Sequence, residues 1–221
     1  MKLTDLNGVQ LANAKVINQA LVDIGLTNPF LRAGILAVVG KESGFELKHE
    51  ISYANTPAKR IIQIFGADRF KGFDIDVLKK SDKSFFDLVY NRKDLGNGPL
   101  EGYKYRGRGF NQLTGKANYF IVGKGIGVDI VTNPDLMDTV EIAAKALAYY
   151  FRSTIVAAQF NTIFFRRYGI ITTSQIKDIL QGARIAHNAN MGFKYPPEAD
   201  PTGGYQITID SAPSFLPLTQ N

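Results

Sequence analysis

Apolar residues recur at helical spacing over much of the chain. Between residues 9 and 26 they fall on one face, which predicts an amphipathic helix. Asn28 and Pro29 then supply a capping side chain and a proline at the first helical position, so we expect a second helix to begin there. Residues 30–39 are apolar on nearly every side, which is typical of a buried helix, and Gly44 is its expected stop.

The rest of the chain alternates between helical patterns and loops. Residues 45–57 predict an irregular loop, and the glycines between residues 91 and 112 predict an extended, turn-rich segment. Further helices are expected at residues 57–65, 75–90, 138–153 and 174–187. Because there is no strand-rich half, the sequence predicts a mainly α fold. We expect one domain over residues 1–195, followed by an irregular tail with several prolines and glycines over residues 196–221.

Composition narrows the possible chemistry. The 221 residues include no cysteine, which excludes a disulfide framework and a cysteine-based zinc site. The two histidines, His49 and His187, are far apart in sequence, so we expect neither a metal site nor a cofactor. The net charge of +6 favours a polyanionic partner, either nucleic acid or the anionic bacterial envelope, unless the excess lysine serves solubility alone.

Glu42 is the first candidate for acid–base chemistry. It follows the most apolar helix in the chain, where desolvation and the negative end of the helix dipole both favour the protonated form of a carboxyl group. A protonated glutamic acid is what glycosidic cleavage needs in order to protonate the leaving oxygen. The alternative is a solvated glutamate at a helix end, paired with Lys41.

Glu50 is the second candidate, because it lies in a polar loop over residues 49–56 that offers groups to hold a carboxylate and a water molecule. An ionised carboxylate near a protonated one completes the pair that glycoside hydrolysis uses. The alternative is an ordinary loop glutamate. Glu46 is a rival, since it would share a helix face with Glu42 if Gly44 did not end the helix.

Residues 102–119 combine aromatic, basic, amide and glycine residues. Aromatic faces stack on sugar rings or on bases, the polar side chains form hydrogen bonds with hydroxyl and acetamido groups, and glycines let the backbone approach a ligand. The Arg-Gly-Arg-Gly run also fits a nucleic-acid-binding segment, although such tracts normally repeat many times, and it fits a purely structural turn.

Five segments carry a resemblance to a known family. They are Lys41–Phe45, Glu50–Ala54, Tyr105–Gly115, Asn118–Tyr119 and Gly127–Leu136. In order and spacing these segments resemble glycoside hydrolase family 19, which includes plant-type chitinases and many bacteriophage endolysins. They are more similar to the endolysin branch, and the similarity extends from about residue 30 to about residue 155.

The resemblance implies a lysozyme-like, mainly α fold with a catalytic cleft and an inverting, single-displacement mechanism. It places the general acid at Glu42 and the general base at Glu50, with their carboxyl groups expected roughly 6.5–9.5 Å apart. It also implies that Thr114, together with Gln112, helps to hold the attacking water. The implied substrate contacts are Tyr53, Tyr105, Arg106, Asn111, Gln112 and, as the loosest match, Asn188.

We therefore expect residues 1–195 to form the catalytic domain of an endolysin-type N-acetylmuramidase, which cleaves β-1,4 bonds of bacterial peptidoglycan. A chitinase of the same fold and a non-catalytic cell-wall-binding or baseplate component are the alternatives. The expected partner is the glycan strand, with no nucleic acid, no stable membrane insertion and a monomeric protein. No apolar run typical of a signal peptide follows Met1. We therefore expect accumulation in the host cytoplasm and access to the wall after a membrane lesion, or carriage in the virion.

Overall fold

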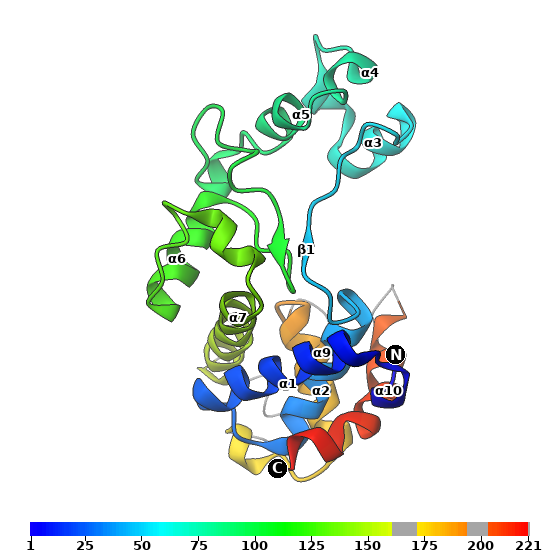
Figure 1. Ribbon diagram of the computed structural model, residues 1–221, viewed down its shortest axis with the longest axis vertical. Helices are drawn as coiled ribbons and strands as arrows, with labels where there is room; N and C mark the ends of the chain where they lie inside the picture. The colour runs from blue at the N-terminus through cyan, green and yellow to red at the C-terminus, as the bar shows by residue number, and fades with distance from the viewer. Residues whose placement is uncertain (161–171, 194–202, 221) are drawn as a thin grey trace. The chain divides into compact units, whose positions relative to one another are not determined.

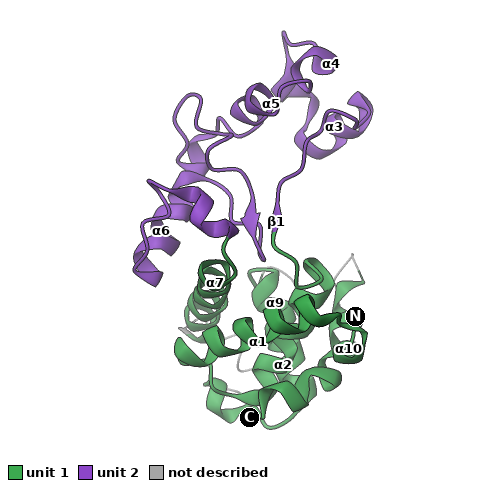
Figure 2. Cartoon of the chain, in the orientation of Figure 1, with its two compact units in different colours: residues 1–47, 139–221 green, residues 48–138 purple. Residues whose placement is uncertain are grey.

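The computed structural model, drawn in Figure 1 with its α-helices and β1 labelled, describes residues 1–160, 172–193 and 203–220. The chain divides into two compact units (Figure 2). Unit 1 consists of residues 1–47 and 139–221, and unit 2 consists of residues 48–138. The helical pattern did not predict this division, because unit 1 is assembled from the two ends of the chain. The boundary expected at residue 195 falls inside unit 1 and does not separate the units.

Unit 1 is a group of helices built around α2. Its helices are α1 (Gly8–Asp23), α2 (Pro29–Glu42), α7 (Val140–Phe160), α9 (Ile179–Asn190) and α10 (Gly204–Thr219), with 3₁₀ turns at Leu3–Asp5 and Thr173–Gln175. Helix α2 packs against α9 and α10, and α1 packs against α7. Residues 31–40 of α2 are all buried, which confirms the buried helix predicted from the sequence.

Both ends of α2 follow from the local sequence. The side chain of Asn28 accepts a hydrogen bond from the backbone N–H of Leu31, and Pro29 occupies the first helical position, as predicted. The helix ends at Glu42, and Gly44 then adopts a left-handed conformation with φ of 65°. The predicted stop at this glycine is therefore confirmed.

Two glycines let α2 and α9 approach each other closely. A Cβ atom on Gly34 would lie 2.7 Å from the carbonyl oxygen of Gly182, and one on Gly182 would lie 2.2 Å from the carbonyl oxygen of Phe30. Any larger residue at either position would push the two backbones apart. The contact fixes α9, and with it Asn190 at the end of that helix, against α2.

The irregular tail expected over residues 196–221 was wrong in its main part, because residues 204–219 form α10. The buried side chains of α10 recur at helical spacing: Thr208, Ser211, Ala212, Phe215 and Thr219. Most of them are small or polar, and Pro213 and Pro217 lie inside the helix. Those features hid the helical pattern. Residues 196–202 and 221 lie outside the described residues.

Unit 2 combines short helices with a two-stranded sheet. Its elements are β1 (Lys48–His49), α3 (Ala58–Phe65), α4 (Ile75–Leu78), α5 (Asp82–Val89), β2 (Arg108–Gly109) and α6 (Lys116–Ile126), with 3₁₀ turns at Ala67–Phe70, Lys93–Leu95 and Pro134–Asp138. The helix predicted over residues 75–90 is in fact two helices. A second one starts because the side chain of Ser81 caps the backbone N–H of Ser84.

Helices α3 and α5 enclose a small aromatic core. The buried members of this aromatic cluster are Ile61, Phe70, Phe85, Phe86 and Val89, and the partly buried side chains packed against them include Tyr53, Phe65, Tyr90 and Tyr103. The cluster is unit 2's own hydrophobic core in this region, and it holds two tyrosines that reach Glu50.

The pairing of β1 with β2 brings two distant parts of the sequence together. The strands are antiparallel, with Lys48 opposite Gly109 and His49 opposite Arg108. The backbone N–H of Glu50 donates to the carbonyl oxygen of Gly107 at 2.8 Å, which extends the pairing by one step. The loop predicted over residues 45–57 therefore contains a short strand, and that strand places Glu50 beside Gly107, within residues 102–119.

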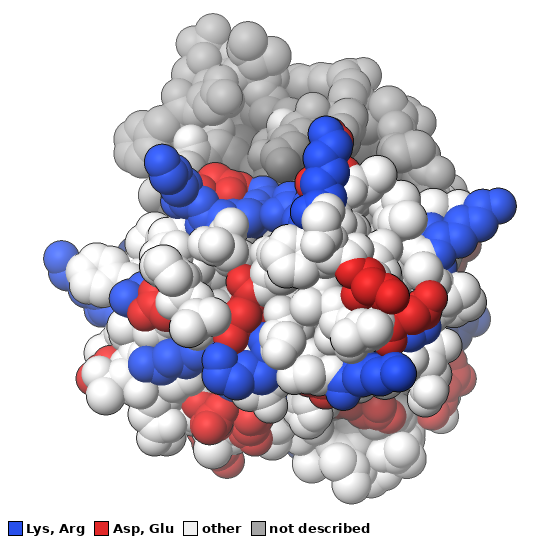
Figure 3. All heavy atoms as spheres, turned by 90° about the horizontal axis from the view of Figure 1, so that it is seen from above, with Lys and Arg blue, Asp and Glu red and all other residues white. Residues whose placement is uncertain are grey.

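The surface charge is mixed. On the face drawn in Figure 3, lysine and arginine side chains lie interspersed with aspartate and glutamate side chains. Two ion pairs of unit 2 join residues that are close in sequence, Lys71 with Asp68 and Lys79 with Asp76. Among the residues that the structure describes, no helix is both long enough and apolar enough to cross a membrane.

Candidate active site

Glu50 lies among hydrogen-bond donors. The Tyr90 hydroxyl is 2.7 Å from Oε1 and 2.7 Å from Oε2 of the Glu50 carboxylate. The Tyr53 hydroxyl lies 3.4 Å from Oε1, and the backbone N–H of Gly107 lies 3.5 Å from Oε2, so these two contacts are long. Such an arrangement satisfies an ionised carboxylate, which can only accept hydrogen bonds.

Two opposing effects act on the Glu50 carboxyl group. Burial raises its pKa above the ordinary value, because desolvation penalises the charged form. The hydrogen bonds from Tyr90, Gly107 and Tyr53 and the positive charge of Arg106 each lower the pKa, but together they do not cancel the desolvation. The net result is a carboxylate whose pKa is raised, even though its surroundings are built to stabilise its charge. Carboxyl groups with such raised pKa values are concentrated at functional sites.

We expect Glu50→Gln to increase thermal stability at neutral pH, since glutamine avoids the cost of ionising a partly buried carboxyl group. The pKa of Glu50 is raised in the folded state, so the wild type loses stability relative to the variant as pH rises from the unfolded pKa, about 4.3, through the folded pKa. Below the unfolded pKa both side chains are neutral, and the difference should disappear. Thermal unfolding between about pH 4 and about pH 8 measures this. A difference between the proteins that stays constant with pH would contradict the expected cost.

Gln112 links the two strands from an unusual backbone conformation. Its Nε2 donates to the carbonyl oxygen of Lys48 at 2.7 Å and to that of Gly109 at 3.2 Å. Its φ of 52° lies in the left-handed region, which a side chain such as glutamine rarely adopts. Backbone strain of this kind is often found at functional sites.

Gly107 borders the side chains of both predicted water-holding residues. A Cβ atom added at Gly107 would lie 3.0 Å from Oε1 of Gln112 and 3.2 Å from Oγ1 of Thr114. The Thr114 hydroxyl itself donates to the carbonyl oxygen of Gln112 at 2.9 Å. Since Gly107 is also paired with Glu50, the structure brings Glu50, Gln112 and Thr114 together around one glycine.

Tyr105 does not line an open surface, contrary to the prediction. Its side chain is 1% exposed, and its hydroxyl donates to the carbonyl oxygen of Val131 at 3.0 Å. The neighbouring Arg108 is also buried, where it donates to the carboxylate of Asp135 and to the carbonyl oxygen of Lys104. Both side chains are therefore buried in unit 2, where their hydrogen bonds stabilise the conformation of residues 102–119.

Arg106 is held by Tyr103, and Asn111 has an unsatisfied acceptor. The Arg106 guanidinium lies over the ring of Tyr103, 4.1 Å from its centroid, and donates to the carbonyl oxygen of the same residue at 2.9 Å. Oδ1 of Asn111 is buried and accepts no hydrogen bond from any residue that the structure describes. An unsatisfied buried acceptor is costly, and a ligand with a hydrogen-bond donor would relieve that cost.

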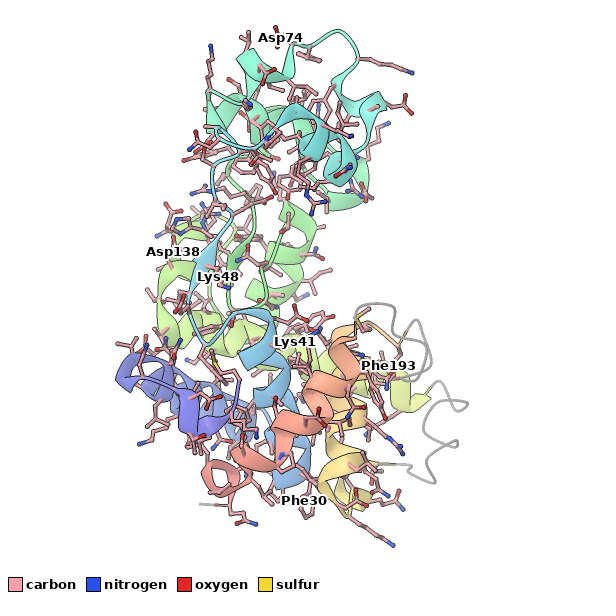
Figure 4. The ribbon with its side chains drawn as sticks, turned by 90° about the vertical axis from the view of Figure 1, so that its right-hand side faces the viewer. Phe30, Lys41, Lys48, Asp74, Asp138 and Phe193 are labelled. Atoms are coloured by element: carbon pink, nitrogen blue, oxygen red, sulfur yellow. The ribbon has the colours of Figure 1, made fainter. Side chains whose placement is uncertain are left out.

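Glu42 lies at the end of α2 in unit 1, and its surroundings there are polar. Its side chain is 45% exposed and pairs with Lys41 at 2.6 Å. Figure 4 labels Lys41 near the end of this helix. The apolar setting expected for Glu42 is therefore not present in unit 1, because the continuous burial of α2 ends at Gly40. The ion pair with Lys41 is the alternative that the sequence left open.

Glu46 is not a helical neighbour of Glu42. Helix α2 ends before it, and the left-handed Gly44 redirects the chain. The Glu46 carboxylate is exposed and accepts a hydrogen bond from Nε2 of Gln10 at 3.3 Å. Glu46 therefore does not share a helix face with Glu42, and that shared face was the condition for it to compete with Glu50 as the second carboxylate.

The structure places Asn190, not Asn188, beside Glu42. Asn188 is 1% exposed, and its Nδ2 donates to the carbonyl oxygen of Arg184 within α9. Asn190, two residues later on the same helix, donates from Nδ2 to Oε1 of Glu42 at 3.1 Å. A substrate contact by Asn188 is incompatible with that burial. Sequence reasoning missed Asn190 and Tyr90, because neither contact is visible in the local pattern.

The comparisons with known proteins point to one family. A family model described as chitinase class I, of glycoside hydrolase family 19, matches residues 87–163. A glycosyl hydrolase family 19 domain-containing protein of Haemophilus influenzae is 29% identical over 146 residues, which are 62% of this chain and 69% of that protein. Residues 87–163 thus match glycoside hydrolase family 19, and the similarity to the Haemophilus influenzae protein extends beyond that segment. The chain is therefore a glycoside hydrolase of the chitinase and lysozyme-like kind, with the mainly α fold predicted from its sequence.

Plant members of family 19 match a smaller part. The basic endochitinase of Vitis vinifera is 45% identical over 53 residues, 24% of this chain and 17% of that protein. The acidic 27 kDa endochitinase of Solanum lycopersicum is 43% identical over 111 residues, 41% of this chain and 45% of that protein. The chain thus spans less than half the length of these plant relatives. The family-model segment contains Tyr90, Gln112 and Thr114, whereas Glu42 and Glu50 precede it.

Proposed function

We propose that this protein cleaves the β-1,4 bonds of bacterial peptidoglycan as an N-acetylmuramidase, by an inverting mechanism that uses Glu42 and Glu50. The observation that carries the proposal is the environment of Glu50. Its partly buried carboxylate accepts hydrogen bonds from Tyr90 and lies beside the Gly107–Thr114 loop, which offers further groups to a water molecule.

The surroundings of Glu50 suit a general base. The described groups within hydrogen-bond distance of its carboxylate oxygens are all donors, so they favour the ionised form that can take a proton from water. The Thr114 hydroxyl can donate and accept at once, and the side-chain oxygen Oε1 of Gln112 can accept. Together they would orient a water molecule next to the base.

Glu42 is the proposed general acid. Lys41 and Asn190 both contact its Oε1, and Oε2 accepts no hydrogen bond from any described residue, so Oε2 is the oxygen that can face a glycosidic bond. We also propose that Asn190 takes the substrate-contacting role that the sequence had assigned to Asn188.

The proposed reaction is one displacement. Glu42 donates its proton to the glycosidic oxygen as the C1–O bond breaks. The water oxygen attacks C1 from the opposite face, and Glu50 accepts one of the water protons. The product sugar carries the new hydroxyl in the α configuration, because attack from the far side inverts a β bond.

Peptidoglycan is the proposed substrate because the protein carries a net charge of +6, which favours encounter with an anionic wall. Chitin is the second candidate, since the protein shares sequence similarity with plant endochitinases. A zymogram with bacterial cell walls in one gel and glycol chitin in another separates these functions. Clearing of the wall gel supports the proposal, clearing of the chitin gel alone supports a chitinase, and clearing of neither supports a non-catalytic wall-binding protein.

Gly107→Ala tests whether the space between Gln112 and Thr114 is used. The added methyl group would force both side chains to move by a few tenths of an ångström, without strain from a positive φ. Since misplacement by 1 Å can cost about a hundredfold, we expect kcat to fall roughly tenfold with little change in Tm. Gly8→Ala is the matched control, because no atom lies within 4 Å of its added Cβ. Full activity of Gly107→Ala would show that this space plays no part in catalysis.

A further inference from the structure

The aromatic cluster of unit 2 fixes the rings of two tyrosines. The ring of Tyr90 stacks on Phe86, with centroids 6.0 Å apart and an interplanar angle of 4°, and it meets Phe65 edge-on at 6.2 Å. The ring of Tyr53 stacks on Phe85 at 5.0 Å and also meets Phe65 edge-on, at 5.3 Å. Phe65 therefore contacts both tyrosines, and the two rings are held by one set of neighbours.

The backbone around Tyr90 is anchored as well. Nδ2 of Asn97 donates to the carbonyl oxygen of Tyr90 at 2.8 Å, and Nη1 of Arg69 donates to the carbonyl oxygen of Val89 at 3.0 Å. Ring and backbone are thus fixed independently. The Tyr90 hydroxyl therefore reaches the Glu50 carboxylate from a rigid base, which is how a catalytic group is held in a productive orientation.

We propose that Tyr90, assisted by Tyr53, is a positioning residue that holds Glu50 in one orientation and in its ionised form. This inference rests on the proposed role of Glu50 as the general base. The Tyr90 hydroxyl bridges both carboxylate oxygens at 2.7 Å, which restricts rotation of the carboxylate plane and stabilises its negative charge. The 3.4 Å contact from Tyr53 makes a smaller contribution.

Both phenols remain protonated donors over the whole working range of pH. Burial and the neighbouring Glu50 charge raise the pKa of Tyr53 to about 12, and the same two causes raise the pKa of Tyr90 well above its ordinary value. Among the described charged groups, Arg106 acts on Glu50, Arg60 on Tyr53 and Arg92 on Tyr90. Arg69 also faces the cluster and donates to the carbonyl oxygens of Phe65 and Val89. A guanidinium group keeps its proton in proteins, so Glu50, whose pKa burial raises, is the group here whose charge changes with pH.

The test measures the Glu50 carboxyl group directly. Six glutamates are present in the chain, so ¹³C NMR of protein labelled at the glutamate carboxyl carbons gives a small set of signals, and the signal lost in Glu50→Gln is that of Glu50. In Tyr90→Phe the ring packing remains and one donor to the charged form is lost. The pKa of Glu50 should therefore rise by about one pH unit. Tyr53→Phe should raise it less.

Tyr103→Phe is the matched control, because Tyr103 packs against Phe86 at 6.3 Å and makes no contact with Glu50. It should leave the Glu50 pKa unchanged, and Tm should remain close to that of the wild type in all three variants. The acid limb of the kcat/KM–pH profile on a soluble oligosaccharide should move upward in Tyr90→Phe by the same amount as the NMR pKa, because both report the free enzyme and a base must be ionised to act.

The outcomes separate this inference from the proposed function. An unchanged NMR pKa of Glu50 in Tyr90→Phe would overturn the role of Tyr90 and leave the assignment of Glu50 intact. A raised NMR pKa with an unmoved acid limb would overturn the assignment of Glu50 as the base, and the role of Tyr90 with it. A parallel shift of both supports the inference.

Discussion

Replacing Glu42 with glutamine should lower kcat by about 10²–10⁴-fold, because an amide cannot protonate the leaving oxygen and general acid catalysis contributes about that much. Glu42 is 45% exposed, so the change should leave the fold and Tm unaffected. The assay is release of soluble fragments from purified cell walls. Glu46→Gln is the matched control, since this exposed glutamate lies nearby in the sequence and should be dispensable.

A second substrate tells an acid from a base. An oligosaccharide with a dinitrophenyl leaving group departs without protonation, so Glu42→Gln should recover much of the wild-type rate on it. Glu50→Gln should remain slow, because attack by water still needs a base. If Glu42→Gln retains more than about a tenth of wild-type activity on cell walls, Glu42 is not the acid. If Glu50→Gln is the variant that recovers, the two roles are reversed.

Glu50→Gln should lower kcat on a natural glycan by a similar factor, about 10²–10⁴-fold, while its stability at neutral pH rises. Thr114→Ala should be milder, because the base remains and only one contact to the water is lost. Proton NMR of the earliest products from a soluble chito- or muro-oligosaccharide reports the mechanism in the wild type. We expect the α-anomer first. The β-anomer appearing first would show a retaining enzyme, in which a carboxylate attacks the sugar directly.

Much of the helical fold was predictable because helix caps and periodicity are local. Asn28, Pro29 and Gly44 delimit α2 through contacts within a few residues of each other. Helix α10 was not predicted, because its buried side chains are mostly small or polar and two prolines lie within it. The division into two units was also hidden, since it depends on contacts between the two ends of the chain.

The candidate site was predictable by residue type and less so by environment. An aromatic residue in a glycine-rich block has the same sequence signature whether it faces solvent or the core, so Tyr105 was misplaced. Asn188 and Asn190 are two residues apart on α9 and therefore lie on different faces, which a sequence match alone cannot distinguish. Tyr90 reaches Glu50 only through the aromatic cluster and the pairing of β1 with β2, and both are long-range features.

The most direct test of the proposed activity is mass spectrometry of purified peptidoglycan digested by the wild-type protein, with Glu42→Gln as the inactive control. An N-acetylmuramidase leaves N-acetylmuramic acid at each new reducing end, with every peptide bond intact. We expect those fragments from the wild type and none from Glu42→Gln. New reducing ends on N-acetylglucosamine, cut peptides, or intact peptidoglycan beside rapidly degraded chitin would contradict the proposed specificity.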